Sequence, residues 1–227
     1  MFIDHFAIMF FPNVKVLRII GRISFPIFAF MIAEGCKYTK NKLRYFAMIF
    51  AMGVIFQIVY YVVEQSLYMC IFITFSTSIL MIYALAFFKK QLFKGKSVSL
   101  IALALLLFAS TVLATYFLNK VLRIDYGFWG CMLPVFASLF HADIKDENQK
   151  PLQKIDCNLL SVICLAVGLC IAAYVLKSLQ IYSLLALPFL LLYSGERGKC
   201  KMKYFFYVFY PAHLVLLYAV QFVMALI

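Results

Sequence analysis

Apolar residues run through this chain in nine long stretches, and the short connections between them carry most of its charged groups. Most stretches continue for about 20 residues, the length that an α-helix needs to cross the hydrocarbon core of a bilayer. Strands of a membrane barrel would instead alternate apolar and polar residues over shorter segments. The pattern therefore predicts an all-α polytopic transmembrane bundle with about nine membrane segments. The predicted segments are residues 1–12, 19–36, 45–63, 68–88, 98–118, 127–142, 157–176, 180–193 and 204–226.

The first predicted segment is too short for a full span, because only eleven residues precede Pro12. We expect either a short re-entrant helix or a chain that begins after its native start, and we find no basic region of a signal peptide before the apolar residues. The longest polar stretch is the short one over 143–155. We therefore expect no soluble domain, and we predict a single membrane domain over residues 1–227.

The composition agrees with a membrane protein, since 66% of the residues are hydrophobic and only 13% are charged. Soluble domains have roughly half apolar and about a quarter charged residues. The net charge of +12 is expected to report orientation and contact with anionic headgroups of the lipid bilayer rather than nucleic acid. The seven cysteines form no CxxC pair and lie mostly in apolar runs, which predicts neither a disulfide framework nor a metal site.

Basic residues are divided unequally between the connections on the two sides of the predicted membrane. Fifteen fall in one alternating set of connections and five in the other, so the positive-inside rule places the first set in the cytoplasm. The N-terminus is then predicted to be cytoplasmic and Ile227 extracytoplasmic. The fifteen are Lys37, Lys40, Lys42, Arg44, Lys89, Lys90, Lys94, Lys96, Lys145, Lys150, Lys154, Arg197, Lys199, Lys201 and Lys203.

The stretch from Arg18 to Lys40 is apolar enough to cross a bilayer, yet it contains Arg22 and Glu34. Ionisable groups at membrane depth are costly and usually face a protein interior or a wet cavity, where they mark a functional site. The two residues are roughly 18 Å apart along a helix, so they would reach different ends of one cavity. The alternative is that both lie at the headgroup boundaries, where Arg22 would snorkel.

Two histidines lie in separate apolar segments, His5 beside Asp4 near the start and His213 in the last segment. Imidazole titrates near neutral pH, so a buried pair favours a role in proton transfer, although a purely structural role is the alternative. Asp4 is expected to pair with Arg22 across a helix interface. His141 lies at a helix end before a charged loop, where we expect it to be solvated or interfacial.

Three further polar residues have simpler structural interpretations. Gln57 and Thr74 lie inside predicted spans and are expected to hold helices together rather than bind a ligand. Asp125 precedes a predicted helix and is expected to cap it. No Walker loop, GxGxxG, HExxH or GxSxG motif occurs, which argues against an ATPase, a dinucleotide enzyme, a zinc protease and an elbow serine hydrolase.

Three sequence blocks resemble, in order, the TraX family of bacterial membrane proteins. They are MFIDHFAIMFFP, LRIIGRISFPIFAFMIAEGCKYTKNKLRYF and FYVFYPAHLVLLY. The similarity covers roughly the first 80 and the last 25 residues. It implies a membrane acetyltransferase in the bacterial cytoplasmic membrane, since TraX is linked to acetylation of the pilin N-terminus. Such an enzyme would use acetyl-CoA as the acyl donor and an amine or hydroxyl of a protein or glycan as acceptor.

The resemblance and the residue pattern together give a hypothetical site without a metal ion. His5 or His213 is expected to act as general base, or to carry the acetyl group transiently, while Arg22 stabilises the oxyanion or holds Asp4. Glu34 is the remaining predicted catalytic residue. The predicted partners of acetyl-CoA are basic or aromatic residues that follow it: Lys37, Tyr38, Lys40 and Arg44.

Two other classes of function remain open at this level. One is a membrane component of a small-molecule transporter, which would bind its ligand without turnover. The other is a non-catalytic scaffold of a pilus or conjugation apparatus, which would tolerate loss of both histidines. The enzyme hypothesis predicts that polar side chains from the first, second and last segments converge on one hydrated chamber open to the cytosol.

Overall fold

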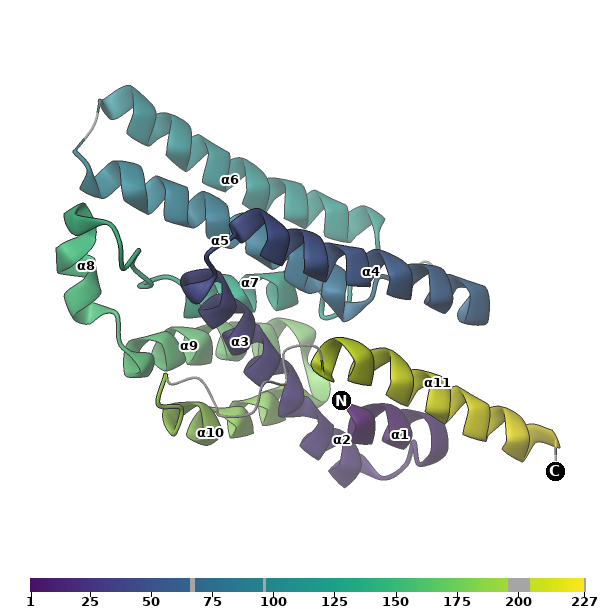
Figure 1. Cartoon of the computed structure of the whole chain (residues 1–227). Coiled ribbons are helices and arrows are strands. Elements are labelled where there is room, and N and C mark those ends of the chain that lie inside the picture. Colours follow the sequence, from purple (N-terminus) through teal and green to yellow (C-terminus); the bar gives the residue numbers. More distant parts are fainter. Residues whose placement is uncertain (66–67, 96, 196–204, 227) are drawn as a thin grey trace.

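The computed structural model describes residues 1–65, 68–95, 97–195 and 205–226, and within them the regular structure is helical (Figure 1). The predicted all-α bundle is thereby confirmed. Five of the basic residues used to predict orientation, Lys96, Arg197, Lys199, Lys201 and Lys203, lie outside the described residues. The helices are α1 (Phe2–Phe10), α2 (Lys15–Arg22), α3 (Ser24–Tyr38), α4 (Lys42–Glu64), α5 (Ile71–Phe93), α6 (Val98–Val121), α7 (Gly127–Ala137), η1 (Glu147–Gln149), α8 (Lys150–Ile155), α9 (Asn158–Leu176), η2 (Ser178–Ala186), α10 (Leu187–Leu191) and α11 (Phe205–Leu226).

Within the described part of the chain, five helical stretches are long and apolar enough to cross a membrane. Shorter apolar helical stretches occupy 127–137, 179–191 and 208–224, so eight of the nine predicted segments lie on one of these stretches. The first predicted segment forms α1, which has only nine residues and is too short to span. The five long stretches are Lys15–Tyr38, Lys42–Val62, Ile71–Phe93, Val98–Val121 and Asn158–Leu176.

The connections define two ends of the bundle. We call the end with residues 39–41, 94–95 and 138–157 the lysine-rich end, and the end with residues 68–70 and 122–126 the opposite end. In Figure 1, α8 at the lysine-rich end lies on the left and the C-terminus lies on the right. The sequence prediction assigns the lysine-rich end to the cytoplasm.

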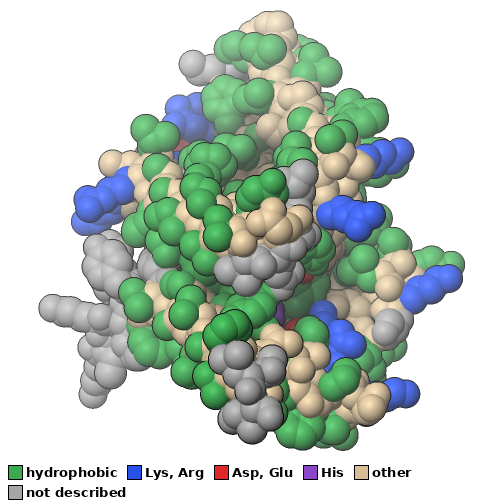
Figure 2. Space-filling model, turned by 90° about the vertical axis from the view of Figure 1, so that its right-hand side faces the viewer, with side chains coloured by type: hydrophobic (Ala, Val, Ile, Leu, Met, Phe, Trp, Pro, Cys, Tyr) green, Lys and Arg blue, Asp and Glu red, His purple; other side chains and the backbone are tan. Residues whose placement is uncertain are grey.

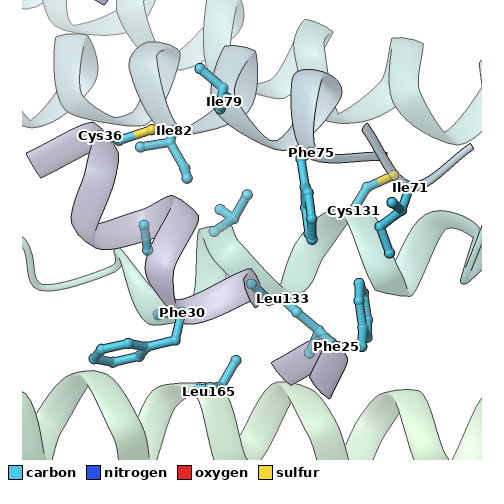
Figure 3. Packing of buried hydrophobic residues seen from close by; sticks show 14 of the residues in the cluster. Phe25, Phe30, Cys36, Ile71, Phe75, Ile79, Ile82, Cys131, Leu133 and Leu165 are labelled. Carbon is cyan, nitrogen blue, oxygen red and sulfur yellow. The ribbon is translucent and has the colours of Figure 1, made fainter. Parts of the chain in front are cut away.

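The core is centred on α5, which packs against α3, α4, α6 and α7. Figure 3 shows how aromatic and aliphatic side chains of α3, α5, α7 and α9 meet there, among them Phe25, Phe75, Leu133 and Leu165. In a bilayer such contacts are held by close van der Waals packing more than by exclusion of water. On α6, by contrast, long apolar side chains such as Leu106 are exposed, as expected of a helix that faces lipid.

At the opposite end, backbone hydrogen bonds tie two connections together. The Met69 N–H donates to the Arg123 carbonyl (2.8 Å), and the Asp125 N–H donates to the Met69 carbonyl (3.0 Å). Gln57 and Thr74 hold the same connections, since the Gln57 amide donates to the Tyr68 carbonyl and the Thr74 hydroxyl donates to the Asp125 carbonyl. Gln57 and Thr74 thus hold α4 and α5 to these connections, whereas the sequence predicted contacts between helices.

Candidate functional site

A cavity of about 400 Å³ opens at the opposite end of the bundle. Its walls come from α1, α2, α3, α4 and α11 and from the two connections that are tied together there. Figure 2 looks at this end of the molecule and shows a hollow with histidine, acidic and basic side chains inside an apolar surround. The polar residues of the wall include Asp4, His5, Arg22, Asp125 and Tyr126.

The Asp4 carboxylate and the Arg22 guanidinium form an ion pair across the α1–α2 interface, with 3.2 Å between Oδ2 and the guanidinium nitrogen. The sequence prediction of this pair is confirmed. Both side chains are mostly buried, at 12% and 15% exposure, so the pair is shielded from bulk water. Arg22 also donates to the Tyr126 hydroxyl at 3.4 Å.

Gly21 explains how α1 comes so close to α2. A Cβ built on Gly21 would overlap the Asp4 side chain, with its Cγ only 2.8 Å away. Ile23 separates α2 from α3 but keeps right-handed helical dihedrals, and the Ser24 hydroxyl donates to the Gly21 carbonyl there (2.8 Å). The missing side chain at Gly21 therefore lets Asp4 pack against α2, where it meets the Arg22 guanidinium in the cavity wall.

The two histidines predicted from the sequence lie side by side, with 5.4 Å between ring centroids. His5 lines the cavity and His213 lies behind it, buried at 3% exposure. His213 Nδ1 is 2.9 Å from the Phe209 carbonyl, which only accepts, so Nδ1 carries the proton and neutral His213 has a free lone pair on Nε2. Two imidazolium ions this close would repel each other, which favours at least one neutral ring in the pair.

Tyr68 and Asp125 form another part of the wall, where the Tyr68 hydroxyl donates to Asp125 Oδ1 at 2.7 Å. The predicted capping role of Asp125 is wrong, because Tyr126 occupies the N-cap position of α7 in a left-handed conformation (φ 58°) without a side-chain cap. Burial raises the pKa of Asp125 to about 6, although the Tyr68 hydrogen bond and the Arg22 charge oppose this shift. Burial and the nearby Asp125 also raise the pKa of Tyr68.

The shifted pKa of Asp125 predicts a pH dependence of stability. The folded protein holds this proton up to about pH 6, whereas the unfolded chain releases it near 3.8, so stability falls as pH rises through that window. We expect a loss of about 1–2 kcal/mol, less than the full shift implies, because Asp125 is only partly shielded from water in the cavity. Asp125→Asn should lack this loss.

The measurement is the thermal unfolding midpoint in detergent at pH values below and above this window. The stability of the native chain relative to Asp125→Asn should be greater at the lower pH than at the higher pH. If the unfolding midpoints of the two chains change by the same amount between these pH values, Asp125 is not the cause of the pH dependence of stability.

Glu34, the remaining predicted catalytic residue, is not brought to this cavity. Its Oε1 lies 3.2 Å from His141 Nε2 near the lysine-rich end, and His141 also contacts the Ser161 hydroxyl at 3.1 Å. His141 is 8% exposed, so of the two environments predicted for it, solvated or interfacial, the solvated one is wrong. The physical reason is that α3 and α9 pack together there and give both Glu34 and His141 a buried polar partner.

The residues predicted to bind acetyl-CoA also lie away from the cavity wall. Lys37 forms an ion pair with Asp156 at 2.8 Å, and its ammonium lies 5.4 Å from the centre of the Tyr38 ring. Lys40 and Arg44 are exposed at the lysine-rich end. The structure thus separates the predicted acid–base residues from the predicted phosphate-binding residues, and it places the cavity at the end opposite the one we expected.

Sequence reasoning missed Arg18 and Tyr126, which both line the cavity. A signal for Arg18 was present, since it precedes Arg22 by four residues and therefore lies on the same face of α2. Tyr126 gave no such signal, because its position depends on how the connection before α7 folds back onto α2 and α3.

A family model described as "TraX protein" matches residues 1–221, nearly the whole chain. The chain belongs to the TraX family. The resemblance expected from three sequence blocks is therefore confirmed.

The TraX chain is also similar to a protein of Dichelobacter nodosus named "Probable fimbrial assembly protein FimC, serogroup H1". The two are 26% identical over 236 aligned residues, which cover 96% of this chain and 89% of the relative. No solved structure gives a significant match. The name of this relative refers to fimbrial assembly.

The TraX cavity combines groups that suit acid–base and electrostatic chemistry. His5 supplies an imidazole in the wall, and Arg22 supplies a cation whose position is fixed by Asp4 and Tyr126. An imidazole accepts protons near neutral pH, and a held guanidinium stabilises negative charge that develops on oxygen.

Proposed function

We propose that this TraX protein is a membrane acetyltransferase that transfers the acetyl group of acetyl-CoA to an amine or hydroxyl group of an acceptor. The observation that carries the proposal is that His5, which packs against His213, lines the same cavity as the Asp4–Arg22 pair. These groups match the two requirements of acyl transfer, removal of a proton from the nucleophile and stabilisation of an oxyanion.

In this mechanism His5 accepts the proton of the acceptor as its nitrogen or oxygen attacks the thioester carbonyl. Arg22 and the Tyr126 hydroxyl both lie in the cavity wall, and they are the proposed hydrogen-bond donors to the negative oxygen of the tetrahedral intermediate. The C–S bond then breaks, and the proton returns from His5 to the CoA thiolate. His213 serves as a positioning residue that fixes the ring of His5, because it packs against that ring from behind.

The acceptor proposed here is a pilus subunit, at its N-terminal amine, with a cell-surface glycan as the other acceptor class. The support is the name of the similar Dichelobacter protein, which refers to fimbrial assembly. The charge rule places the cavity toward the outer side of the membrane, where an exported subunit is presented. Acetyl-CoA is cytosolic, so the proposal requires that its pantetheine arm thread the bundle and bring the intact thioester to the cavity.

A non-catalytic scaffold in fimbrial assembly is the second candidate. It is favoured by the same name, which refers to assembly and to no reaction. A scaffold would bind pilus subunits and leave acetyl-CoA unchanged, so turnover separates the two functions.

The test is transfer of radiolabel from acetyl-CoA by TraX protein reconstituted in vesicles, with pilin peptides and amino sugars as acceptors. Acetyl-CoA is supplied inside or outside the vesicles in separate samples, which reports the side of the donor. We expect label to accumulate on one acceptor class with time, and Lys145→Gln, an exposed charge at the lysine-rich end, to behave like the native chain. Binding of pilin without any labelled product would support the scaffold instead.

A further inference from the structure

A second cavity of about 390 Å³ adjoins the first at the opposite end of the bundle. The two cavities share Arg18, Arg22, Tyr68, Asp125 and Tyr126 in their walls. The second cavity is also lined by Lys177, which connects α9 to η2, and by Gln180 of η2. A group bound in the second cavity would therefore lie next to the groups in the first.

Three buried N–H donors in the residues of this wall lack a hydrogen-bond partner. They are Nε of Arg18, Nε of Arg22 and the side-chain nitrogen of Gln180. Gln180 is 5% exposed, so its amide is shielded from bulk water as well. A buried donor without an acceptor costs about 1–3 kcal/mol, and three of them around one cavity indicate that an acceptor of hydrogen bonds belongs there.

The charges of the wall indicate that the bound acceptor of hydrogen bonds is negatively charged. Arg18 and Arg22 lie one helical turn apart on α2, and like charges at that spacing repel each other. Asp4 neutralises Arg22, whereas no carboxylate among the described residues forms an ion pair with Arg18. Lys177 adds an exposed third cation, held in an unusual backbone conformation (φ 55°, ψ −169°), and Asp125 is the acidic residue in the shared wall.

We propose that the second cavity is an oxyanion subsite that binds a phosphate or carboxylate group of the acceptor, with Arg18 and Gln180 as its main ligands. Guanidinium groups present their N–H donors in a planar fork that matches both oxyanions, and a neutral amide adds a donor without a charge. The assignment to the acceptor, though not the anion site itself, rests on the proposed function.

The proximity of the cavities favours the acceptor over the donor as the source of the anion. In acetyl-CoA the long pantetheine arm separates the phosphates from the thioester carbon. An anion in the second cavity would instead lie close to the reacting group in the first, because the two share a wall. This arrangement selects an acceptor that carries its negative charge a few bonds from the amine or hydroxyl that is acetylated.

The test measures binding of inorganic phosphate to the full chain in phosphatidylcholine vesicles at constant ionic strength. The readouts are the thermal unfolding midpoint and the fluorescence of the single tryptophan, Trp129, near the start of α7. We expect Arg18→Gln to weaken phosphate binding at least about tenfold, the effect of one lost charge-assisted hydrogen bond. Gln180→Leu should weaken it as well, without any change in net charge.

Lys15→Gln is the matched control, because it removes an equal charge from an exposed position of α2 that lines neither cavity. It should bind phosphate within about twofold of the native chain. Absence of phosphate binding in the native chain, or equal binding by Arg18→Gln, would overturn the subsite. Repeating the binding measurement with acetate then shows whether the subsite prefers a phosphate or a carboxylate group.

A parallel sample contains phosphatidylglycerol in the vesicles. If this lipid abolishes phosphate binding by the native chain, the subsite holds a lipid headgroup and its assignment to the acceptor is overturned. Unchanged phosphate binding supports the acceptor. Because the binding assay needs no acetyl transfer, failure of the proposed enzyme activity and failure of the subsite are measured separately.

Discussion

Replacing His5 with alanine is expected to lower the rate of acetyl transfer by at least about 100-fold. His5 is the imidazole in the cavity wall, and a positioned general base typically contributes 10²–10⁴-fold to a reaction. The alanine variant leaves space where the ring lay, so added imidazole should restore part of the rate. The measurement is the initial rate with radiolabelled acetyl-CoA at saturating acceptor, with and without imidazole.

Two further variants separate the role of His5 from general damage to the cavity. Met9→Ala removes another side chain of the same wall and should retain most of the activity. His213→Ala should have a smaller effect than His5→Ala, because His213 lies behind His5 and not in the wall. Full activity of both histidine variants would remove the imidazoles from the mechanism.

The second large effect is expected at the Asp4–Arg22 pair. Arg22→Gln leaves the Asp4 carboxylate in a mostly buried site without its partner, a change that typically costs 3–5 kcal/mol of folding stability. Asp4→Asn should be destabilising for the converse reason. In the double variant Asp4→Asn/Arg22→Gln no charge remains unpaired, so most of the lost stability should return.

The double variant should recover stability without recovering activity. Arg22 is proposed to stabilise the oxyanion, so the double variant should fold as a stable protein and still transfer acetyl at least about 100-fold more slowly. Unfolding in detergent for all four chains gives the coupling energy of the pair, and the transfer assay gives the rates. A double variant that regains both stability and activity would show that the pair is only structural.

The helical fold and one half of the candidate site were predictable from the sequence. Continuous apolar runs determine helices in a membrane because the backbone has to satisfy its own hydrogen bonds there. The Asp4–Arg22 pair was predictable because both groups are too costly to leave unpaired in apolar segments that adjoin in sequence. The neighbouring histidines followed from the same reasoning, although their 5.4 Å separation depends on how α11 packs on α1.

The other half of the site was not predictable, because it depends on contacts between residues that are far apart in the chain. The spacing along α3 predicts how deep Glu34 lies in the membrane. It does not predict that α9 supplies Ser161 to the buried polar cluster that contains Glu34 and His141. Asp125 likewise has the sequence signature of a helix cap, and only the tie between the Met69 and Asp125 backbones turns it toward Tyr68. Such tertiary contacts override local preference.

The absence of a side chain at Gly21 has a mechanical consequence. Because Asp4 rests directly on the backbone of α2 at that point, α1 and α2 are joined into a rigid hairpin that cannot hinge open without rupturing a buried salt link. The wall that carries Asp4 and Arg22 is therefore expected to keep its shape while an acceptor enters through the existing opening at this end of the bundle.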